Sequence, residues 1–373
     1  MANAFMPEGR AKAARTGGPD ALRRCQASRM SAAPIAAVAT DAAASDETSR
    51  RRHVTIGLVV GVPASAIFLY LASRNVDAGA VIELLRRADP LRLATGVCAL
   101  CLVYVVQAAR WQWVARRHAR LSLGRFVELV VGGIACNNAV PGRPGDLLRA
   151  HWLGRAAGVS RSRAFGTVVV DRASDVLVLV AALAVSSAAV GHHAGWLRRL
   201  DIAAVALAAI VVLVLLGARR HTRRVASVRL ARSRPARVAS GVLHGIGATV
   251  NRRDAPVVAA LSICAWALWG LGAWLVAAAL GIQLSLLETV FVAAIVNLGV
   301  ALPSSPGFVG TYQFLCVASL GVVAVGRADA FAFSVLLHAA WFVPTSVAGL
   351  LLLVVKGSAR AFEAAPASAA NSA

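Results

Sequence analysis

Apolar residues in this chain gather into long, nearly uncharged runs that are separated by short segments containing arginine. These runs cover residues 54–72, 93–109, 126–142, 164–191, 202–218, 255–282, 289–326 and 328–355. A helix that crosses the ~30 Å core of a bilayer needs about 20 consecutive, mainly apolar residues. Six of the runs therefore predict single membrane-spanning helices, and the runs 126–142 and 289–326 need another explanation.

Proline-containing breaks set these two runs apart. The sequence PGRPGD at 141–146 ends the shorter run, and PSSPGF at 303–308 divides the longer one. Proline lacks the backbone donor of a helix and clashes with the preceding turn, so neither run forms one continuous helix. Each break is followed by a long apolar span. We therefore expect two broken hairpins, one in each half of the chain.

The two breaks share the spacing Pro-x-x-Pro-Gly, which suggests an internal repeat. Aligning them places Pro141 on Pro303 and, further along, Arg172 on His338. Inverted repeats with interrupted helices are typical of secondary transporters. Proline and glycine are also frequent in membrane helices generally, which leaves a fold without a repeat as the alternative. The predicted fold is an all-α polytopic membrane protein with about six full spans and two proline-broken hairpins in an inverted repeat.

The composition supports a membrane protein. Of the 373 residues 58% are hydrophobic and 15% are charged, and the net charge is +22. Soluble domains are about 45–50% apolar and about 25% charged, so this composition excludes an ordinary soluble enzyme, a coiled coil and a disordered protein. The arginines lie between the apolar runs and form no single soluble basic face. We therefore expect membrane lipids, and no nucleic acid, as partners.

Arginine also predicts the topology, because cytoplasmic loops are enriched in lysine and arginine. The bias is satisfied when the first hairpin is re-entrant and both termini are cytoplasmic, in the cell inner membrane. The domains expected are a disordered basic tail 1–53, a transmembrane domain 54–355 with an arginine-rich cytoplasmic loop 219–253, and a disordered tail 356–373. Met30 is an alternative start. Oligomeric state is left open.

Asp171, Arg172 and Asp175 form the strongest local signal, inside the span that begins near residue 164. Their spacing places Arg172 and Asp175 on one helix face. A charge at the centre of a membrane helix costs at least ~2.5–3.5 kcal/mol, and Arg172 is the only basic residue inside a predicted span. It is expected to bind an anionic headgroup. The alternatives are an ion-pair cluster that fixes helix packing and a location at the membrane interface.

The first break is the second candidate region. It combines amides, arginines and an acid with the prolines and glycines of the turn, and its candidates are Asn137, Asn138, Pro141, Arg143, Gly145, Asp146 and Arg149. A helix that starts after a break offers free amide groups and a positive dipole end, which suit an anion. The alternative is a plain cytoplasmic turn with solvated arginines.

In the second half, candidates surround the other break, namely Asn297, Pro303, Pro306, Gly307, Gln313 and His338. His338 lies in mid-span, where it is expected either to shuttle a proton or simply to pack. The segment Arg110-Trp111-Gln112-Trp113 ends the second predicted span and is expected to anchor it at the interface, with a functional role as the alternative. No metal-spaced cluster, nucleophile elbow or Walker loop occurs, so no catalytic residue, metal or cofactor is expected.

As an ordered set, these motifs resemble the transmembrane region of lysylphosphatidylglycerol synthases, also called the flippase-like or UPF0104 family. The segment 137–149 resembles the family's NN-x-x-P-x-R-x-G-E-x-x-R, with Asp146 in place of Glu. The segment 171–175 resembles E-R-x-x-D, with Asp171 in place of Glu, and 303–311 resembles P-x-x-P-G-x-x-G-T. Arg110-Trp111 is similar to the family's RW after the second span.

The resemblance implies that the protein moves a lipid headgroup between leaflets. The expected substrate is an anionic or modified lipid, or a lipid-linked precursor. The synthases carry a soluble aminoacyl-transfer domain after the membrane part, and only a short tail follows Val355 here. Lipid aminoacylation by this chain is therefore not expected. Two alternatives stay open, an integral-membrane lipid or glycosyl transferase and a non-catalytic partner of a lipid-modifying enzyme of hopanoid or sphingolipid type.

Overall fold

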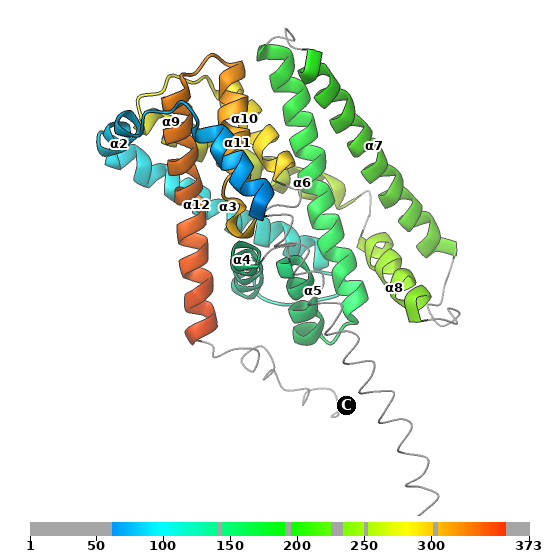
Figure 1. The fold of residues 1–373 in the computed structure, drawn as a ribbon. Helices are drawn as coiled ribbons and strands as arrows, with labels where there is room; N and C mark the ends of the chain where they lie inside the picture. Colours follow the sequence, from blue (N-terminus) through cyan, green and yellow to red (C-terminus); the bar gives the residue numbers. More distant parts are fainter. Residues whose placement is uncertain are drawn as a thin grey trace, which may run out of the picture. The chain divides into compact units, whose positions relative to one another are not determined.

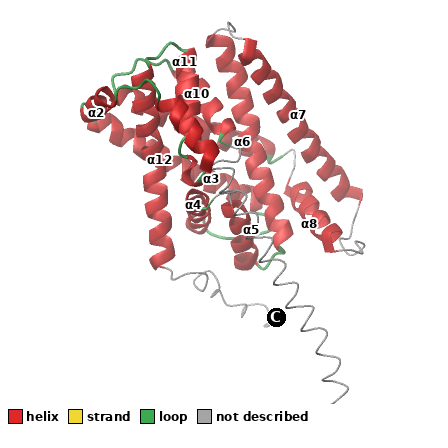
Figure 2. Ribbon diagram, in the orientation of Figure 1, coloured by secondary structure: helices red, strands yellow, loops and turns green. Residues whose placement is uncertain are grey.

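The computed structural model describes residues 62–140, 144–190, 195–224, 234–249, 253–300 and 305–355. These residues all belong to one compact unit, Ile56–Ala373. Helices are the only regular secondary structure within them (Figure 2). The two predicted tails, and the candidates Pro141, Arg143 and Pro303, lie outside the described residues.

Five helices of the described chain are long and apolar enough to cross a membrane. They are α3 (Pro90–Ala115), α6 (Arg161–Val190), α7 (Gly195–Arg224), α9 (Ala255–Ala279) and α12 (Arg327–Val355). The sixth predicted span is described only in part, as a helix over Val62–Ser73. The prediction of an all-α polytopic membrane protein is confirmed.

Both predicted hairpins are broken into pairs of short helices. The shorter elements of the chain are α2 (Ala78–Arg86), α4 (Leu123–Ala139), α5 (Pro144–Ala157), α8 (Arg234–Thr249), α10 (Leu286–Gly299), the 3₁₀ turn η2 (Pro306–Phe308) and α11 (Thr311–Val322). Helices α4 and α5 form the first hairpin, and α10 forms the second with η2 and α11. Each hairpin is followed by a long helix, α6 in one half and α12 in the other (Figure 1).

The two halves are related as an inverted repeat. In the first half, a long helix (α3) is followed by two short helices (α4 and α5) and a second long helix (α6). The same order of helix lengths recurs in the second half, with α9, α10, α11 and α12. Helices α3 and α9 run antiparallel, because the Asp89 amide at the start of α3 donates to the Ala279 carbonyl at 2.8 Å, while Arg116 beyond its end pairs with Asp254. Figure 1 shows α6 and α12 running in opposite directions. In addition α4 packs on α12, and α10 packs on α6.

Small residues bring α3 and α9 together at the junction of the halves. A Cβ added to Gly96 would lie 3.1 Å from the Gly272 carbonyl, and a Cβ added to Gly272 would lie 3.1 Å from the Gly96 carbonyl. Reciprocal close approach of two backbones is typical of membrane helices, where van der Waals packing drives association. The two halves therefore meet along a tight helix pair.

The arginine-rich segment 219–253 differs from the predicted loop. Helix α7 continues to Arg224, and α8 packs on both α6 and α7. A Cβ on Gly245 would lie 2.5 Å from the Arg163 carbonyl, and one on Gly247 would meet Thr222 at 2.1 Å. The small glycine face of α8 explains this packing, so at least α8 belongs to the folded unit.

Close packing at a glycine also shapes the first break. A Cβ at Gly145 would lie 1.8 Å from the Gly133 carbonyl of α4, so no larger residue fits between α4 and α5. The Gly145 amide donates to Asn137 Oδ1 at 2.7 Å. Asn137 thus satisfies one of the free donors at the start of α5.

In the second break, Gly307 and Gly310 adopt positive φ values of 68° and 87°. Glycine enters this region without steric cost. The Gly310 amide donates to Gln313 Oε1 at 2.7 Å, which caps the start of α11. A Cβ at Gly310 would lie 2.0 Å from the Ser65 carbonyl, so the first described helix packs directly over this turn.

We predict that Gly145→Ala lowers the stability of the detergent-solubilised protein by about 1–3 kcal/mol, because the added methyl group forces α4 and α5 apart. Gly217→Ala on α7 is the matched control, since a Cβ there meets nothing within 4 Å. Thermal unfolding of both variants measures the difference. Equal midpoints for Gly145→Ala and wild type would show that the hairpin adapts.

Candidate functional site

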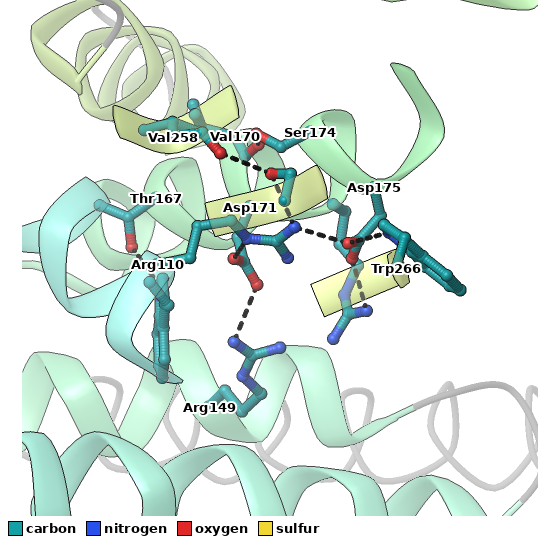
Figure 3. A network of polar contacts seen from close by, with 12 residues as sticks. Arg110, Arg149, Thr167, Val170, Asp171, Ser174, Asp175, Val258 and Trp266 are labelled. Carbon is teal, nitrogen blue, oxygen red and sulfur yellow. Dashed lines mark hydrogen bonds and ion pairs between the residues drawn. The ribbon is translucent and has the colours of Figure 1, made fainter. Parts of the chain in front are cut away.

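An ion-pair network connects α3, α5 and α6 in the interior of the described unit (Figure 3). Arg110 Nε donates to Asp171 Oδ1 at 2.9 Å, and Arg110 Nη1 donates to Asp175 Oδ1 at 2.6 Å. Arg149 Nη2 donates to Asp171 Oδ2 at 3.1 Å. The side chains of Arg110, Arg149 and Asp171 are at most 1% exposed. Asp171 therefore receives one guanidinium group on each carboxylate oxygen.

Neighbouring polar groups on α9 extend this network. Arg110 Nη1 also donates to Ser262 Oγ at 3.1 Å, and Trp266 Nε1 donates to Asp175 Oδ1 at 3.0 Å. Both residues come from α9, in the other half of the repeat. Buried ionic groups are tolerated only when they are paired and hydrogen-bonded. The network thus fixes α9 against α3 and α6.

Arg172 lies at the accessible edge of the network. Its Nε is 3.3 Å from Asp146 Oδ1 and its Nη1 is 3.3 Å from Asp175 Oδ2. Asp146 also accepts from Arg149 Nη1 at 3.4 Å. The Arg172 side chain is 37% exposed and the Asp146 side chain 20%. These two side chains are therefore the members of the network that a ligand reaches first.

The network is balanced in formal charge. Three guanidinium groups, of Arg110, Arg149 and Arg172, face three carboxylates, of Asp146, Asp171 and Asp175. Arg172 therefore has no uncompensated charge to offer. An anion that binds Arg172 has to compete with Asp146 or Asp175 for the same guanidinium group.

The prediction that Arg110 and Trp111 anchor a helix at the interface is wrong. Both residues are 0% exposed. Trp111 Nε1 donates to Thr167 Oγ1 at 3.1 Å, and the Arg149 guanidinium lies 4.2 Å from the centre of the Trp111 ring. Helix α3 continues to Ala115, so Arg110 lies inside a candidate span. The prediction that Arg172 is the only basic residue inside a span is therefore wrong as well. Pairing with Asp171 and Asp175 stabilises this buried position.

For Arg149, the structure excludes the alternative interpretation of a solvated arginine in a cytoplasmic turn. Its side chain is 1% exposed, and it is held between the Trp111 ring and the Asp171 carboxylate. The sequence signal that was overlooked is the shared face of Gln107, Arg110, Trp111 and Val114, which have the spacing of one helix stripe. All four are buried.

Gln313 and His338 contact each other in the second half. Gln313 Nε2 lies 3.0 Å from His338 Nδ1, while Gln313 Oε1 caps α11. The His338 ring stacks on Tyr312 and Trp341, with centroid distances of 4.6 and 5.2 Å. His338 is 7% exposed. The Gln313–His338 contact therefore helps to position the rings of Tyr312 and Trp341.

A cavity of 140 Å³ lies where the two halves meet. It is lined by the predicted candidates Asn137, Asn138, Asp146, Arg172 and Asn297, together with Val103, Tyr104, Gln107, Ile134, Trp266, Trp269, Val300, Phe308, Tyr312 and Trp341. The ends of α4 and α10 and the η2 turn all reach it. Both hairpin breaks therefore converge on one mainly polar and aromatic cavity.

The amides of the cavity have distinct roles. Asn138 Nδ2 donates to Ser346 Oγ at 2.9 Å and to Thr345 Oγ1 at 3.3 Å, which connects α4 to α12. Its buried Oδ1 has no hydrogen-bond partner among the described residues. Asn297 Nδ2 donates to the Ala293 carbonyl at 2.9 Å. Asn138 thus retains a buried acceptor beside the cavity that no donor of the described residues satisfies.

The two breaks also approach each other next to the cavity. A Cβ added to Gly307 would lie 3.0 Å from the Phe342 ring and 3.6 Å from the Asn138 carbonyl. Pro306 and Gly307 shape the η2 turn that presents Phe308 to the cavity. No group of three or more His, Cys, Asp and Glu suited to a metal occurs in the part of the chain that the structure describes.

Comparison with known proteins identifies the family. Residues 54–349 match the family model described as the lysylphosphatidylglycerol synthase TM region. The chain belongs to this family. Several of the residues that carry the resemblance to the lysylphosphatidylglycerol synthase TM region, among them Arg149, Asp171, Arg172 and Asp175, belong to the ion-pair network.

Curated relatives agree with this assignment. A UPF0104 membrane protein of Methanothermobacter thermautotrophicus is 27% identical over 127 residues, which are 33% of this chain and 36% of the relative. Glycosyltransferase AglD of Haloferax volcanii is 25% identical over 338 residues, which are 80% of this chain and 54% of the relative. A UPF0104 membrane protein of Pyrococcus horikoshii is 28% identical over 127 residues, 37% of its length. The chain thus spans about a third to a half of these relatives.

We predict that Arg110→Met destabilises this member of the lysylphosphatidylglycerol synthase TM family by about 3–5 kcal/mol, because removing one partner leaves buried carboxylates uncompensated. Arg87→Met is the control, since Arg87 is 78% exposed and pairs with Glu83 at the surface. The measurement is the thermal unfolding midpoint in detergent. A similar small shift for both variants would contradict a stabilising role of the network.

Proposed function

We propose that this protein moves a lipid with a polar headgroup between the leaflets of the cytoplasmic membrane. One observation carries the proposal, the convergence of both hairpin breaks on a polar cavity beside Arg172 and Asp146. Irregular backbone at membrane depth is tolerated only where protein buries it or where it lines a cavity. Binding sites between inverted repeats are a general feature of transporters that alternate between two faces.

The lining suggests how the headgroup is held. The side chains of Asn138 and Gln107 offer hydrogen bonds, and the rings of Trp266, Tyr312 and Trp341 offer flat apolar faces. Sites of this kind combine apolar walls with a few polar groups that fix orientation. The headgroup exchanges hydration for these contacts while it passes the middle of the membrane.

The substrate class follows from the charges. Among the residues of the network, Arg172 is the arginine that borders the cavity. An anionic headgroup binds there when it displaces Asp146 from Arg172, while a modified headgroup with hydroxyl or amine groups binds beside an intact pair. The candidate substrates are therefore anionic lipids, modified lipids and lipid-linked precursors. The partners we propose are membrane lipids. The proposed topology places both termini on the cytoplasmic side.

We predict that Arg172→Ala slows translocation of a headgroup-labelled lipid in proteoliposomes by about tenfold or more, since a charge-assisted contact of ~1.5–3 kcal/mol is lost. The probes are labelled phosphatidylglycerol and a monoglycosylated diacylglycerol, and the readout is access of a membrane-impermeant quencher. Arg87→Ala is the surface control. Equal rates for Arg172→Ala and wild type would remove Arg172 from the mechanism, and no protein-dependent movement of either probe would contradict translocation of these lipids.

A membrane-embedded glycosyl transfer is the second candidate, because the relative that aligns over 80% of the chain is named a glycosyltransferase. Asp146 is the acid that borders the cavity, and it accepts from both Arg149 and Arg172. Such pairing leaves few free lone pairs for work as a general base. Product formation by the purified protein with a labelled sugar donor and a lipid acceptor, lost in Asp146→Asn, would favour transfer over translocation.

A further inference from the structure

A second hollow of 330 Å³ lies between α6 and α7. Its walls are apolar side chains of the two helices, among them Phe165, Val176, Ile210 and Val214. Two charged side chains, Asp146 and Arg172, also line it. We call this hollow the α6/α7 groove.

The groove results from incomplete packing of α7. Ala204 and Ala218 are buried, but none of the residues between them on α7 is buried. Several large apolar side chains of this stretch are exposed, including Ile210 at 58% and Val214 at 49%. Helix α7 therefore packs closely near two points and leaves an apolar gap between them, at the depth of a candidate membrane span. In a bilayer, such a gap is filled by hydrocarbon.

Asp146 and Arg172 line both the α6/α7 groove and the central cavity. The ion pair between them, with Nε and Oδ1 3.3 Å apart, thus stands between an apolar hollow and a polar one. An amphiphilic molecule fits this arrangement, with its hydrocarbon chain in the α6/α7 groove and its headgroup in the central cavity. Neither the groove nor the cavity alone matches both parts of such a molecule.

The ion pair is also suited to open. When Arg172 moves away from Asp146, it keeps Asp175 Oδ2 at 3.3 Å as a partner. Asp146 keeps Arg149 Nη1 at 3.4 Å. Opening therefore leaves neither charge alone, which avoids the large penalty of an isolated buried ion. The pairs Arg110–Asp171 and Arg110–Asp175 are unaffected and hold the helices in place.

We propose that the α6/α7 groove holds one hydrocarbon chain of the substrate lipid, and that the Arg172–Asp146 pair is the gate through which its headgroup enters the central cavity. The occupant is a membrane lipid, because the groove is apolar, borders a polar cavity and lies along an exposed membrane-spanning helix. This inference rests on the proposed translocation and adds a lateral entrance and a chain-binding site to it.

Neighbouring positions on α7 provide a matched test. Val214 lines the groove, while Leu213 does not and is 68% exposed. Both side chains are partly or largely exposed, so tryptophan at either position is compatible with the fold. We expect Val214→Trp to slow movement of the labelled lipids by about tenfold, the effect of losing ~1.4 kcal/mol of binding, and Leu213→Trp to leave it unchanged. Thermal unfolding of both variants checks that the fold is retained.

A second measurement does not depend on transport. The photoreactive residue p-benzoylphenylalanine is incorporated at position 214 or 213 of the full chain in its native membrane, and lipids attached after illumination are identified by mass spectrometry. We expect adducts at 214 to be enriched in one lipid class and adducts at 213 to reflect the bulk membrane. Bulk composition at both positions, or protein adducts at 214 from a second copy, would overturn the groove as a substrate site.

The outcomes separate the two proposals. If Arg172→Ala slows translocation and Val214→Trp does not, the translocation proposal stands and the groove is rejected. If wild type moves neither probe but position 214 still captures a selected lipid, the groove stands as a lipid site and translocation of these probes is rejected.

Discussion

The requirement to neutralise charge inside an apolar environment organises this molecule. Arg110 is completely buried in a membrane-spanning helix, where an isolated guanidinium group is strongly unfavourable. Asp171 and Asp175 on α6 compensate it, while Ser262 on α9 accepts a further hydrogen bond from Arg110 and Trp266 on α9 donates one to Asp175. Three long helices are therefore held in register by one set of polar contacts. The cavity and the Arg172–Asp146 pair lie at the edge of this buried network.

The charges of the network form a buried inner group and a partly exposed outer group. The inner pairs are fully buried and close, while the outer pairs around Arg172 are longer and partly exposed. Shared partners connect the two layers, because Asp175 binds both Arg110 and Arg172, and Arg149 binds both Asp171 and Asp146. Movement at the edge is thus possible while the centre stays paired.

Much of the fold was accessible from local sequence signals. The long apolar runs and the two Pro-x-x-Pro-Gly breaks predict the helices and hairpins, because hydropathy and proline act within a few residues. Arg110 was misassigned for the opposite reason, since its burial depends on acids more than 60 positions away. The aromatic wall of the cavity, including Trp266 and Tyr312, comes from separate helices and has no spacing signature in one segment. The α6/α7 groove depends on how α7 packs against α6, which no single helix encodes.

The exchange of partners between the halves has a consequence for biosynthesis. Helix α4 packs on α12 and α10 packs on α6, so each hairpin completes its packing only on the long helix of the opposite half. The early hairpin leaves the ribosome well before α12 is made, and until then its amides and glycine-lined face lack their final neighbours. Membrane insertion of this protein therefore passes through a partly folded intermediate. In this intermediate the first hairpin contacts the translocon or surrounding lipid until α12 is inserted.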